Sequence, residues 1–302
     1  MSRTFYIKNT KAPKVMNLSE LLAIAAEDLE QFALSKDDED YDALMAEPLS
    51  EFHPILVACD DFSGRGFELG YDREKDCYKV IAFTPSTLND WRTIFETIAR
   101  LANHLSVEEV IDEEENAYQA GHITYDYRED IAYGIDAMLS RYETGKTIAF
   151  FGYYRPMVLG EEEITQLQAA ADRVQFFSDW VEEQQHIDAH YARLRFVKDK
   201  EGTIIGNYML SSGLPTILPY ELPPLIDVRK WDITAEGVGS WQLSLMAVTD
   251  NTKLPNSYED LGTVDYQAFL NRLPEHKKER LDGHYMVVTL TQEEMKAIRD
   301  EE

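Results

Sequence analysis

Apolar positions recur at helical spacing in several separate stretches of the chain, and each stretch predicts a helix that buries one face. The clearest pattern in the first half covers residues 86–105, with Ser86 placed as the N-cap. Another begins at Asn17, where Glu20 completes a capping-box pattern, and its apolar stripe continues to Phe32. The other predicted helices cover residues 127–142, 161 to at least 181, 265–273 and the segment after Thr291.

Shorter apolar runs bounded by turn residues predict strands between these helices. The predicted strands cover residues 4–8, 54–59, 66–71, 77–83, 147–153, 191–197, 203–210, 241–248 and 284–290. An acidic stretch, residues 35–51, is expected to be a solvated loop. Helices and strands do not alternate as a doubly wound parallel sheet requires, so the sequence predicts an α+β fold with mixed or antiparallel sheets and packed helices.

The length of the chain, 302 residues, is compatible with two domains. Pro and Gly punctuate residues 145–160, so the expected division is an N-terminal α+β unit of residues 1–150 and a C-terminal α+β unit of residues 151–302. A single large domain is the alternative. Apolar residues make up 44% of the chain, enough to build a substantial core.

Charge narrows the classes of partner. The chain has 29 Lys and Arg against 56 Asp and Glu, a formal net charge of −27. A chain with this net negative charge repels nucleic acid and anionic lipid, and it attracts cations or a basic protein. The long uncharged run over residues 202–220 contains Pro215 and Pro219 and predicts strand and loop rather than a membrane span.

The first residues lack the apolar stretch of a signal peptide, and the two cysteines, Cys59 and Cys77, suit a reducing compartment. We therefore expect a cytoplasmic protein. Neither cysteine has a histidine neighbour or a helix-start context, so both are expected to be small core residues.

Glu182, His186 and His190 form the most suggestive chemical cluster, since their spacing keeps three metal-ligand types near one helical face. If the helix from residue 161 continued that far, both histidines would lie roughly 120° to 160° from its apolar stripe, toward solvent. The segment His-Ile-Asp-Ala-His also lacks the glutamate of the HExxH zinc motif. The pattern favours exposed histidines over a metal site, and no cofactor is expected.

The loop Ser63-Gly64-Arg65-Gly66 is similar to a fragment of a phosphate-binding loop, because glycines let backbone N–H groups approach an anion. A strand follows it where the phosphate motifs require a helix, so a turn leading into a hairpin is the better interpretation.

Carboxylate groups and aromatic clusters complete the candidates. The carboxylates favour solvated surface over acid–base chemistry, and the aromatics fit either core packing or a binding surface. The carboxylates lie at residues 60–61, 112–115 and 161–163, and the aromatic clusters are Tyr125/Tyr127, Tyr153/Tyr154 and Trp231/Trp241.

Three short segments together resemble a known family. They are GRGFEL at residues 64–69, TPST at residues 84–87 and Asp90-Trp91. The resemblance is to an uncharacterised family of ~300-residue proteins from low-GC Gram-positive bacteria, and it extends over nearly the whole chain. It implies a bacterial, cytoplasmic setting and assigns no catalytic residue.

The leading hypothesis is a non-catalytic acidic binding protein for a cationic protein partner, of the immunity or antitoxin-like kind. One alternative is a metal-assisted enzyme that uses Glu182, His186 and His190. The other is a structural or oligomeric housekeeping protein. The oligomeric state is left open by the sequence.

Overall fold

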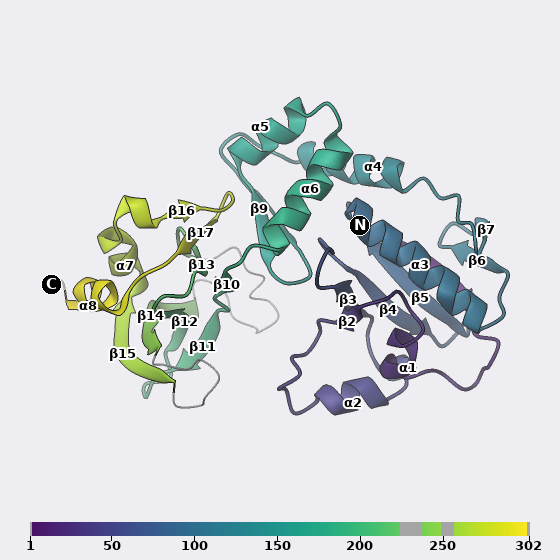
Figure 1. Ribbon diagram of the computed structural model, residues 1–302, viewed down its shortest axis with the longest axis horizontal. Helices are drawn as coiled ribbons and strands as arrows, with labels where there is room; N and C mark the ends of the chain where they lie inside the picture. Colours follow the sequence, from purple (N-terminus) through teal and green to yellow (C-terminus); the bar gives the residue numbers. More distant parts are fainter. Residues whose placement is uncertain (1, 224–236, 249–256, 301–302) are drawn as a thin grey trace. The chain divides into compact units, whose positions relative to one another are not determined.

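The computed structural model describes residues 2–223, 237–248 and 257–300 (Figure 1). The helices are α1 (Leu18–Leu22), α2 (Tyr41–Ala46), α3 (Leu88–His104), α4 (Tyr127–Leu139), α5 (Glu161–Ala169), α6 (Arg173–Gln185), α7 (Tyr266–Arg272) and α8 (Gln292–Asp300). The strands are β1 (Ser2–Lys8), β2 (Leu29–Gln31), β3 (Ile55–Cys59), β4 (Phe67–Asp72), β5 (Cys77–Phe83), β6 (Glu109–Asp112), β7 (Ala117–Gln119), β8 (Ile148–Phe151), β9 (Pro156–Leu159), β10 (His190–Tyr191), β11 (Arg195–Lys198), β12 (Ile204–Ser211), β13 (Thr216–Pro219), β14 (Val238–Val248), β15 (Tyr258–Asp265), β16 (Glu279–Arg280) and β17 (Tyr285–Val288). This mixture confirms the α+β class.

Two compact units make up the chain. The first comprises Met1–Arg155 and Ile164–His186, and the second comprises Pro156–Glu163 and Ile187–Glu302. The chain therefore passes between the units three times, and α6 belongs to the first unit although it follows β9 in sequence. Whether residues 1–150 and 151–302 are separate domains stays a prediction.

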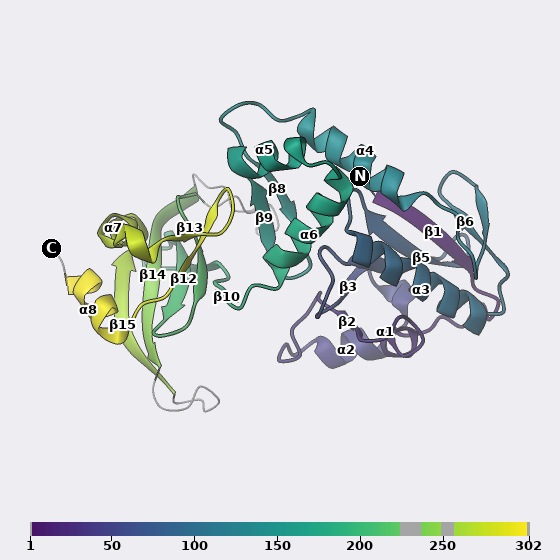
Figure 2. The ribbon, with the colours of Figure 1, turned by 45° about the horizontal axis from the view of Figure 1, so that its top comes forward.

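The first unit is built on an antiparallel seven-stranded sheet with the order β2-β3-β4-β5-β1-β6-β7. Helix α3 packs against β1 and β5, and α4 and α6 pack against α3 (Figure 2). Phe5 on β1 and Trp91 on α3 are fully buried, with their ring centroids 6.2 Å apart in an edge-to-face arrangement. The core of this unit thus lies between the sheet and α3.

The second unit contains two four-stranded sheets, β10-β13-β17-β16 and β11-β12-β14-β15. The pairs β10/β13 and β12/β14 are parallel and the other pairs are antiparallel, which confirms the expected mixed sheets. Residues from both sheets and from α7 and α8 share one core, which includes Tyr208, Leu245, Phe269, Met286 and Ile298.

Three predicted elements of the first half differ in the structure. The capping box of Asn17 and Glu20 is confirmed, but α1 ends at Leu22 and residues 29–31 form β2, which pairs with β3. The acidic stretch predicted as a loop contains α2. Thr87, rather than Ser86, caps α3. The apolar spacing predicted a longer helix because a local pattern contains no information about the pairing of residues 29–31 with β3.

The prediction of a single long helix from residue 161 is wrong. Helix α5 ends at Ala169, and α6 begins at Arg173 after Asp172 takes the N-cap position. The Asp172 carboxylate accepts a hydrogen bond from the backbone N–H of Gln175 at 3.0 Å. This side chain stabilises a new helix start where the apolar stripe alone predicted continuity.

The loop between β3 and β4 leads into the β4–β5 hairpin, as predicted, and it also binds an anion supplied by the chain itself. The backbone N–H groups of Gly64, Arg65 and Gly66 donate to the Asp90 carboxylate at 3.2, 2.9 and 3.0 Å. Ser86 Oγ and Thr87 N donate to the same carboxylate at 3.0 and 3.3 Å. The glycine-rich segment is therefore a structural nest for a buried aspartate.

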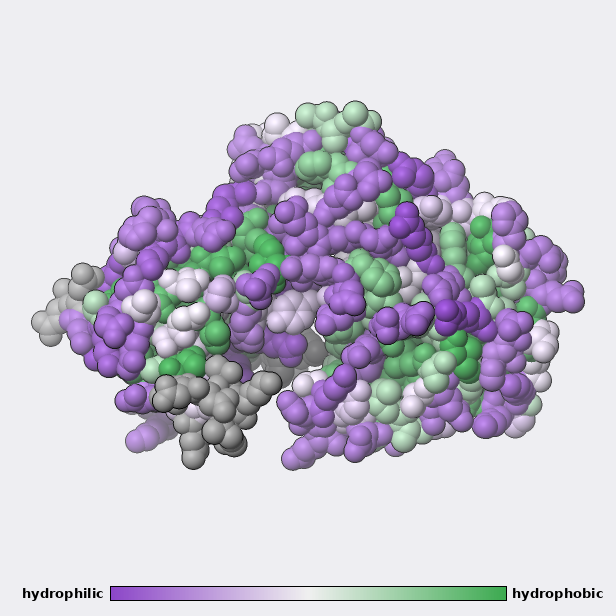
Figure 3. Space-filling view, viewed as in Figure 1, coloured by the Kyte–Doolittle hydropathy of each residue, from purple (hydrophilic) through white to green (hydrophobic). Residues whose placement is uncertain are grey.

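Hydrophilic residues predominate on the face of the molecule shown in Figure 3, and green apolar areas are interspersed among them. Within the described residues, none of the helices combines the length and apolarity that crossing a bilayer requires.

We expect Asp90→Ala to lower the free energy of unfolding by about 3 to 5 kcal/mol, because it leaves several buried N–H donors without an acceptor. Chemical denaturation followed by circular dichroism measures the change. Asp37→Ala is the matched control, since Asp37 is exposed in the acidic stretch, and it should change the stability by less than about 0.5 kcal/mol. Equal stabilities of the two variants would contradict the role assigned to Asp90.

Candidate functional site

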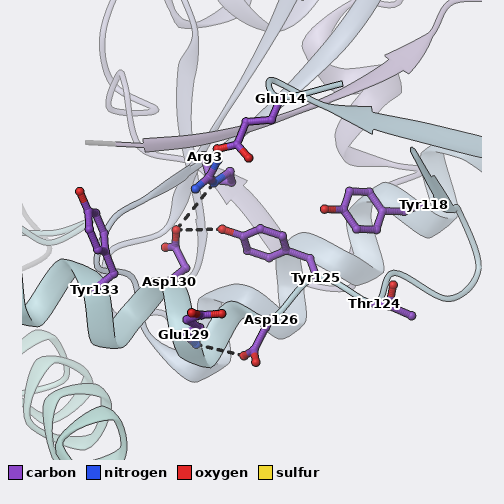
Figure 4. Close-up of a pocket in the computed structure, with 9 residues that line it drawn as sticks. All are labelled: Arg3, Glu114, Tyr118, Thr124, Tyr125, Asp126, Glu129, Asp130 and Tyr133. Atoms are coloured by element: carbon purple, nitrogen blue, oxygen red, sulfur yellow. Dashed lines mark hydrogen bonds and ion pairs between the residues drawn. The ribbon is translucent and has the colours of Figure 1, made fainter. Parts of the chain in front are cut away.

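A cavity of about 560 Å³ opens on the first unit (Figure 4). Its walls come from strands β1 and β7, the segment that joins β6 to β7, the segment before α4 and the first turns of α4. The lining residues are Arg3, Glu114, Tyr118, Thr124, Tyr125, Asp126, Glu129, Asp130 and Tyr133.

Arg3, Tyr125 and Asp130 form the inner part of the cavity. The Tyr125 hydroxyl donates to Asp130 Oδ1 at 2.9 Å, and Thr84 Oγ1 donates to Asp130 Oδ2 at 3.0 Å. Arg3 Nε lies 3.7 Å from Asp130 Oδ1, and its guanidinium carbon lies 5.5 Å from the Tyr125 ring centroid. The Asp130 side chain is almost fully buried, so these partners compensate its desolvation.

Arg3 also pairs with two carboxylates from the segment after β6. Arg3 Nη1 lies 3.1 Å from Glu113 Oε1 and 2.7 Å from Glu114 Oε1. One guanidinium is thus shared by three carboxylates and balances only part of their charge. Four carboxylates line the cavity against this one guanidinium, which leaves it a net charge of −3.

The outer rim is acidic and aromatic. Asp126 caps α4 by accepting a hydrogen bond from Glu129 N at 3.0 Å, and both side chains are exposed. Tyr133, one turn further along α4, is 62% exposed. Asp126 and Glu129 lie in the first turn of a helix, where the macrodipole favours negative charge. Neither carboxylate forms an ion pair in the described part of the chain.

Two tyrosines of the cavity, Tyr118 and Tyr125, are held in the neutral form. Burial, followed by the negative charge of Asp130, raises the pKa of Tyr125. Burial and the hydrogen bond to Asp112 raise the pKa of Tyr118 to about 12. Hydrogen bonds from Asn116 and Tyr118 lower the pKa of Asp112 even though burial acts in the opposite direction. At neutral pH these phenols are hydrogen-bond donors and ring surfaces rather than bases.

The structure does not place Glu182, His186 and His190 on one helical face, because α6 ends at Gln185. Glu182 accepts a hydrogen bond from Asn89 Nδ2 at 2.8 Å, and burial raises its pKa. His186 Nε2 lies 3.0 Å from the carbonyl oxygen of Ser63. His190 begins β10 of the second unit. Across the described residues, no three His, Cys, Asp or Glu side chains are grouped as metal ligands.

Two of the other candidate carboxylates, Asp60 and Glu163, have partners with structural roles. Asp60 accepts a hydrogen bond from the Tyr153 hydroxyl at 3.0 Å. Glu163 accepts one from Gly160 N at 2.9 Å and pairs with Arg280 at 2.6 Å. These contacts fix loops and helix starts.

Both cysteines are free thiols. Burial raises the pKa of Cys59 to about 11 and also raises the pKa of Cys77, so neither is an activated thiolate. Tyr125 and Tyr127 pack on Trp91, with ring centroids 5.3 and 6.1 Å away. Trp231 lies outside the described residues.

Sequence reasoning identified Tyr125 and the 112–115 carboxylates but missed Arg3, Asp130 and Tyr133. The one local signal for Asp130 was its place in the acidic first turn of a predicted helix. Arg3 carries no local signal, because only the pairing of β1 with β6 brings it beside Glu113 and Glu114.

Comparison with known proteins gives one match. A family model described as a domain of unknown function, DUF4299, matches residues 2–298. No curated protein and no solved structure matches the chain.

We expect Tyr118→Phe to lower the free energy of unfolding at neutral pH by about 1 kcal/mol through loss of the bond to Asp112. Because the fold raises the pKa of Tyr118 from 10.0 to about 12, this residue's contribution is complete below about pH 10 and is lost as the pH rises toward 12. Denaturant unfolding at a series of alkaline pH values measures the difference. Tyr133→Phe is the control and should cost less than about 0.5 kcal/mol at neutral pH. A Tyr118→Phe effect that grows above pH 10 would contradict this assignment.

Proposed function

The chain belongs to the DUF4299 family of domains of unknown function, and we propose that it is a non-catalytic binding protein. Its acidic cavity receives a cationic side chain of a basic protein partner. The observation that carries this proposal is the lining of the cavity, where four carboxylates and three tyrosines surround a single arginine. Such a lining is complementary to a guanidinium or ammonium group.

The inner and outer parts of the cavity have different roles in this proposal. Arg3 already pairs with Glu114 and Asp130, so the inner part is a preformed wall. Asp126 and Glu129 at the rim form no ion pair among the described residues, so an incoming cation can pair with them. The exposed ring of Tyr133 supplies a face on which a cationic side chain can pack.

The net charge of −27 supports the same partner class at longer range. A strongly negative surface accelerates encounter with a basic protein and repels nucleic acid. An immunity or antitoxin-like protein that meets a basic toxin in a bacterial cytoplasm fits this chemistry. The free thiols of Cys59 and Cys77 are compatible with that reducing compartment.

The test is capture of a basic protein from native cell extract, compared between variants of equal charge. Asp126→Asn with Glu129→Gln removes both rim charges and keeps a residue that can cap α4. Asp37→Asn with Glu39→Gln removes two exposed charges away from the cavity. We expect the cavity variant to bind the purified partner about tenfold more weakly than the control variant, and high salt to weaken binding to the wild type.

Three results would overturn the proposal. They are recovery of no basic partner, binding that ignores salt, and equal binding by the two charge-matched variants. Circular dichroism of each variant verifies that the fold is retained.

A further inference from the structure

A second cavity in the first unit has the opposite character to the acidic one. Its volume is about 430 Å³, within the range of small-molecule sites. The residues that line it are Lys11, Lys14, Met16, Glu20, Ala23, Ile24, Tyr78 and His104. None of them lines the acidic cavity, so this site is argued independently of the proposed function.

Basic side chains occupy one side of this cavity. Lys11 Nζ lies 2.9 Å from His104 Nε2, and the ammonium group is the donor in this contact because it has no acceptor atom. Lys14 Nζ lies 3.9 Å from Glu20 Oε1, the one carboxylate of the lining. Two lysines against one glutamate give the lining a net charge of +1 from its Lys and Glu side chains, in a chain whose net charge is −27. This concavity is therefore a local basin for anions on an acidic protein.

Tyr78 and Met16 are buried beneath these side chains. The exposed fractions are 1% for Tyr78 and 7% for Met16. The Tyr78 hydroxyl oxygen accepts a hydrogen bond from Met16 N at 2.9 Å. Tyr78 therefore contributes to the floor of the cavity rather than to its exposed surface.

Apolar surface completes the lining. Ile24 is half-buried, and Ala23, the C-cap residue of α1, is exposed. Together with the Tyr78 ring and the Met16 side chain, they offer an apolar wall beside the two ammonium groups. Cavities that combine such a wall with a few convergent polar groups are typical of sites for small organic ligands.

We propose that this cavity binds a small organic phosphate, with the phosphate held by Lys11 and Lys14 and an apolar body packed on Ala23 and Ile24 above the floor of Tyr78 and Met16. The ammonium groups act as point charges for the phosphate. The apolar body distinguishes the ligand from free inorganic phosphate.

The experiment titrates the full chain with phenyl phosphate by isothermal calorimetry, with inorganic phosphate and phenol as separate arms. We expect saturable binding of phenyl phosphate, and binding about tenfold or more weaker for each half of the ligand alone. Lys11→Gln with Lys14→Gln should weaken phenyl phosphate binding about tenfold or more. Lys198→Gln with Lys200→Gln removes the same charge from exposed positions of the second unit and should leave the affinity unchanged.

A second variant tests the apolar wall. Ala23→Glu places a carboxylate there at an exposed position, and it should also reduce phenyl phosphate affinity about tenfold or more. The proposal is overturned if phenyl phosphate does not saturate, if inorganic phosphate binds equally well, or if the Lys11/Lys14 and Lys198/Lys200 variants behave alike. Thermal unfolding of each variant separates loss of binding from loss of the fold.

Discussion

The first unit depends on one buried carboxylate. Asp90 lies in the first turn of α3 and accepts hydrogen bonds from three successive backbone N–H groups, those of Gly64, Arg65 and Gly66. A buried carboxylate is unfavourable unless donors surround it, and buried N–H groups are unfavourable unless an acceptor faces them. The N–H groups compensate the desolvation of the carboxylate, and the carboxylate compensates the desolvation of the N–H groups. The loop after β3 and the start of α3 therefore stabilise each other.

The same junction fixes the elements that carry the acidic cavity. Ser178 Oγ on α6 accepts a hydrogen bond from Leu88 N at 3.1 Å, which ties α6 to the start of α3. A side chain on Gly64 would collide with Thr87 and Val181, so the absence of a Cβ allows this close packing. Thr84, just before the same helix, donates to Asp130 on α4 at 3.0 Å. The helix that supplies most of the rim is therefore positioned from the α3 junction.

The segments that carry the family resemblance are explained by this architecture. Gly64 to Gly66 provide the N–H donors, Ser86 and Thr87 add two more, and Asp90 is the acceptor. Trp91 is fully buried beneath Tyr125, with the ring centroids 5.3 Å apart. These residues thus have structural roles in the described part of the chain. The first unit also has two cavities of opposite charge. One is lined mainly by carboxylates and tyrosines, and the other has two lysines beside an apolar floor.

The sequence by itself determined the α+β class, the β4–β5 hairpin, α3 and the capping box at Asn17, because hydrophobic period and caps depend on residues within about four positions. Only the tertiary structure decided that residues 29–31 form a strand, that α6 ends at Gln185, and that Arg3 lies beside Asp130. The strand β2 forms because it pairs with β3, and Arg3 reaches its carboxylates because β1 pairs with β6. Such partners are distant in sequence, so a local pattern contains no information about the pairing or about the buried charge that it compensates.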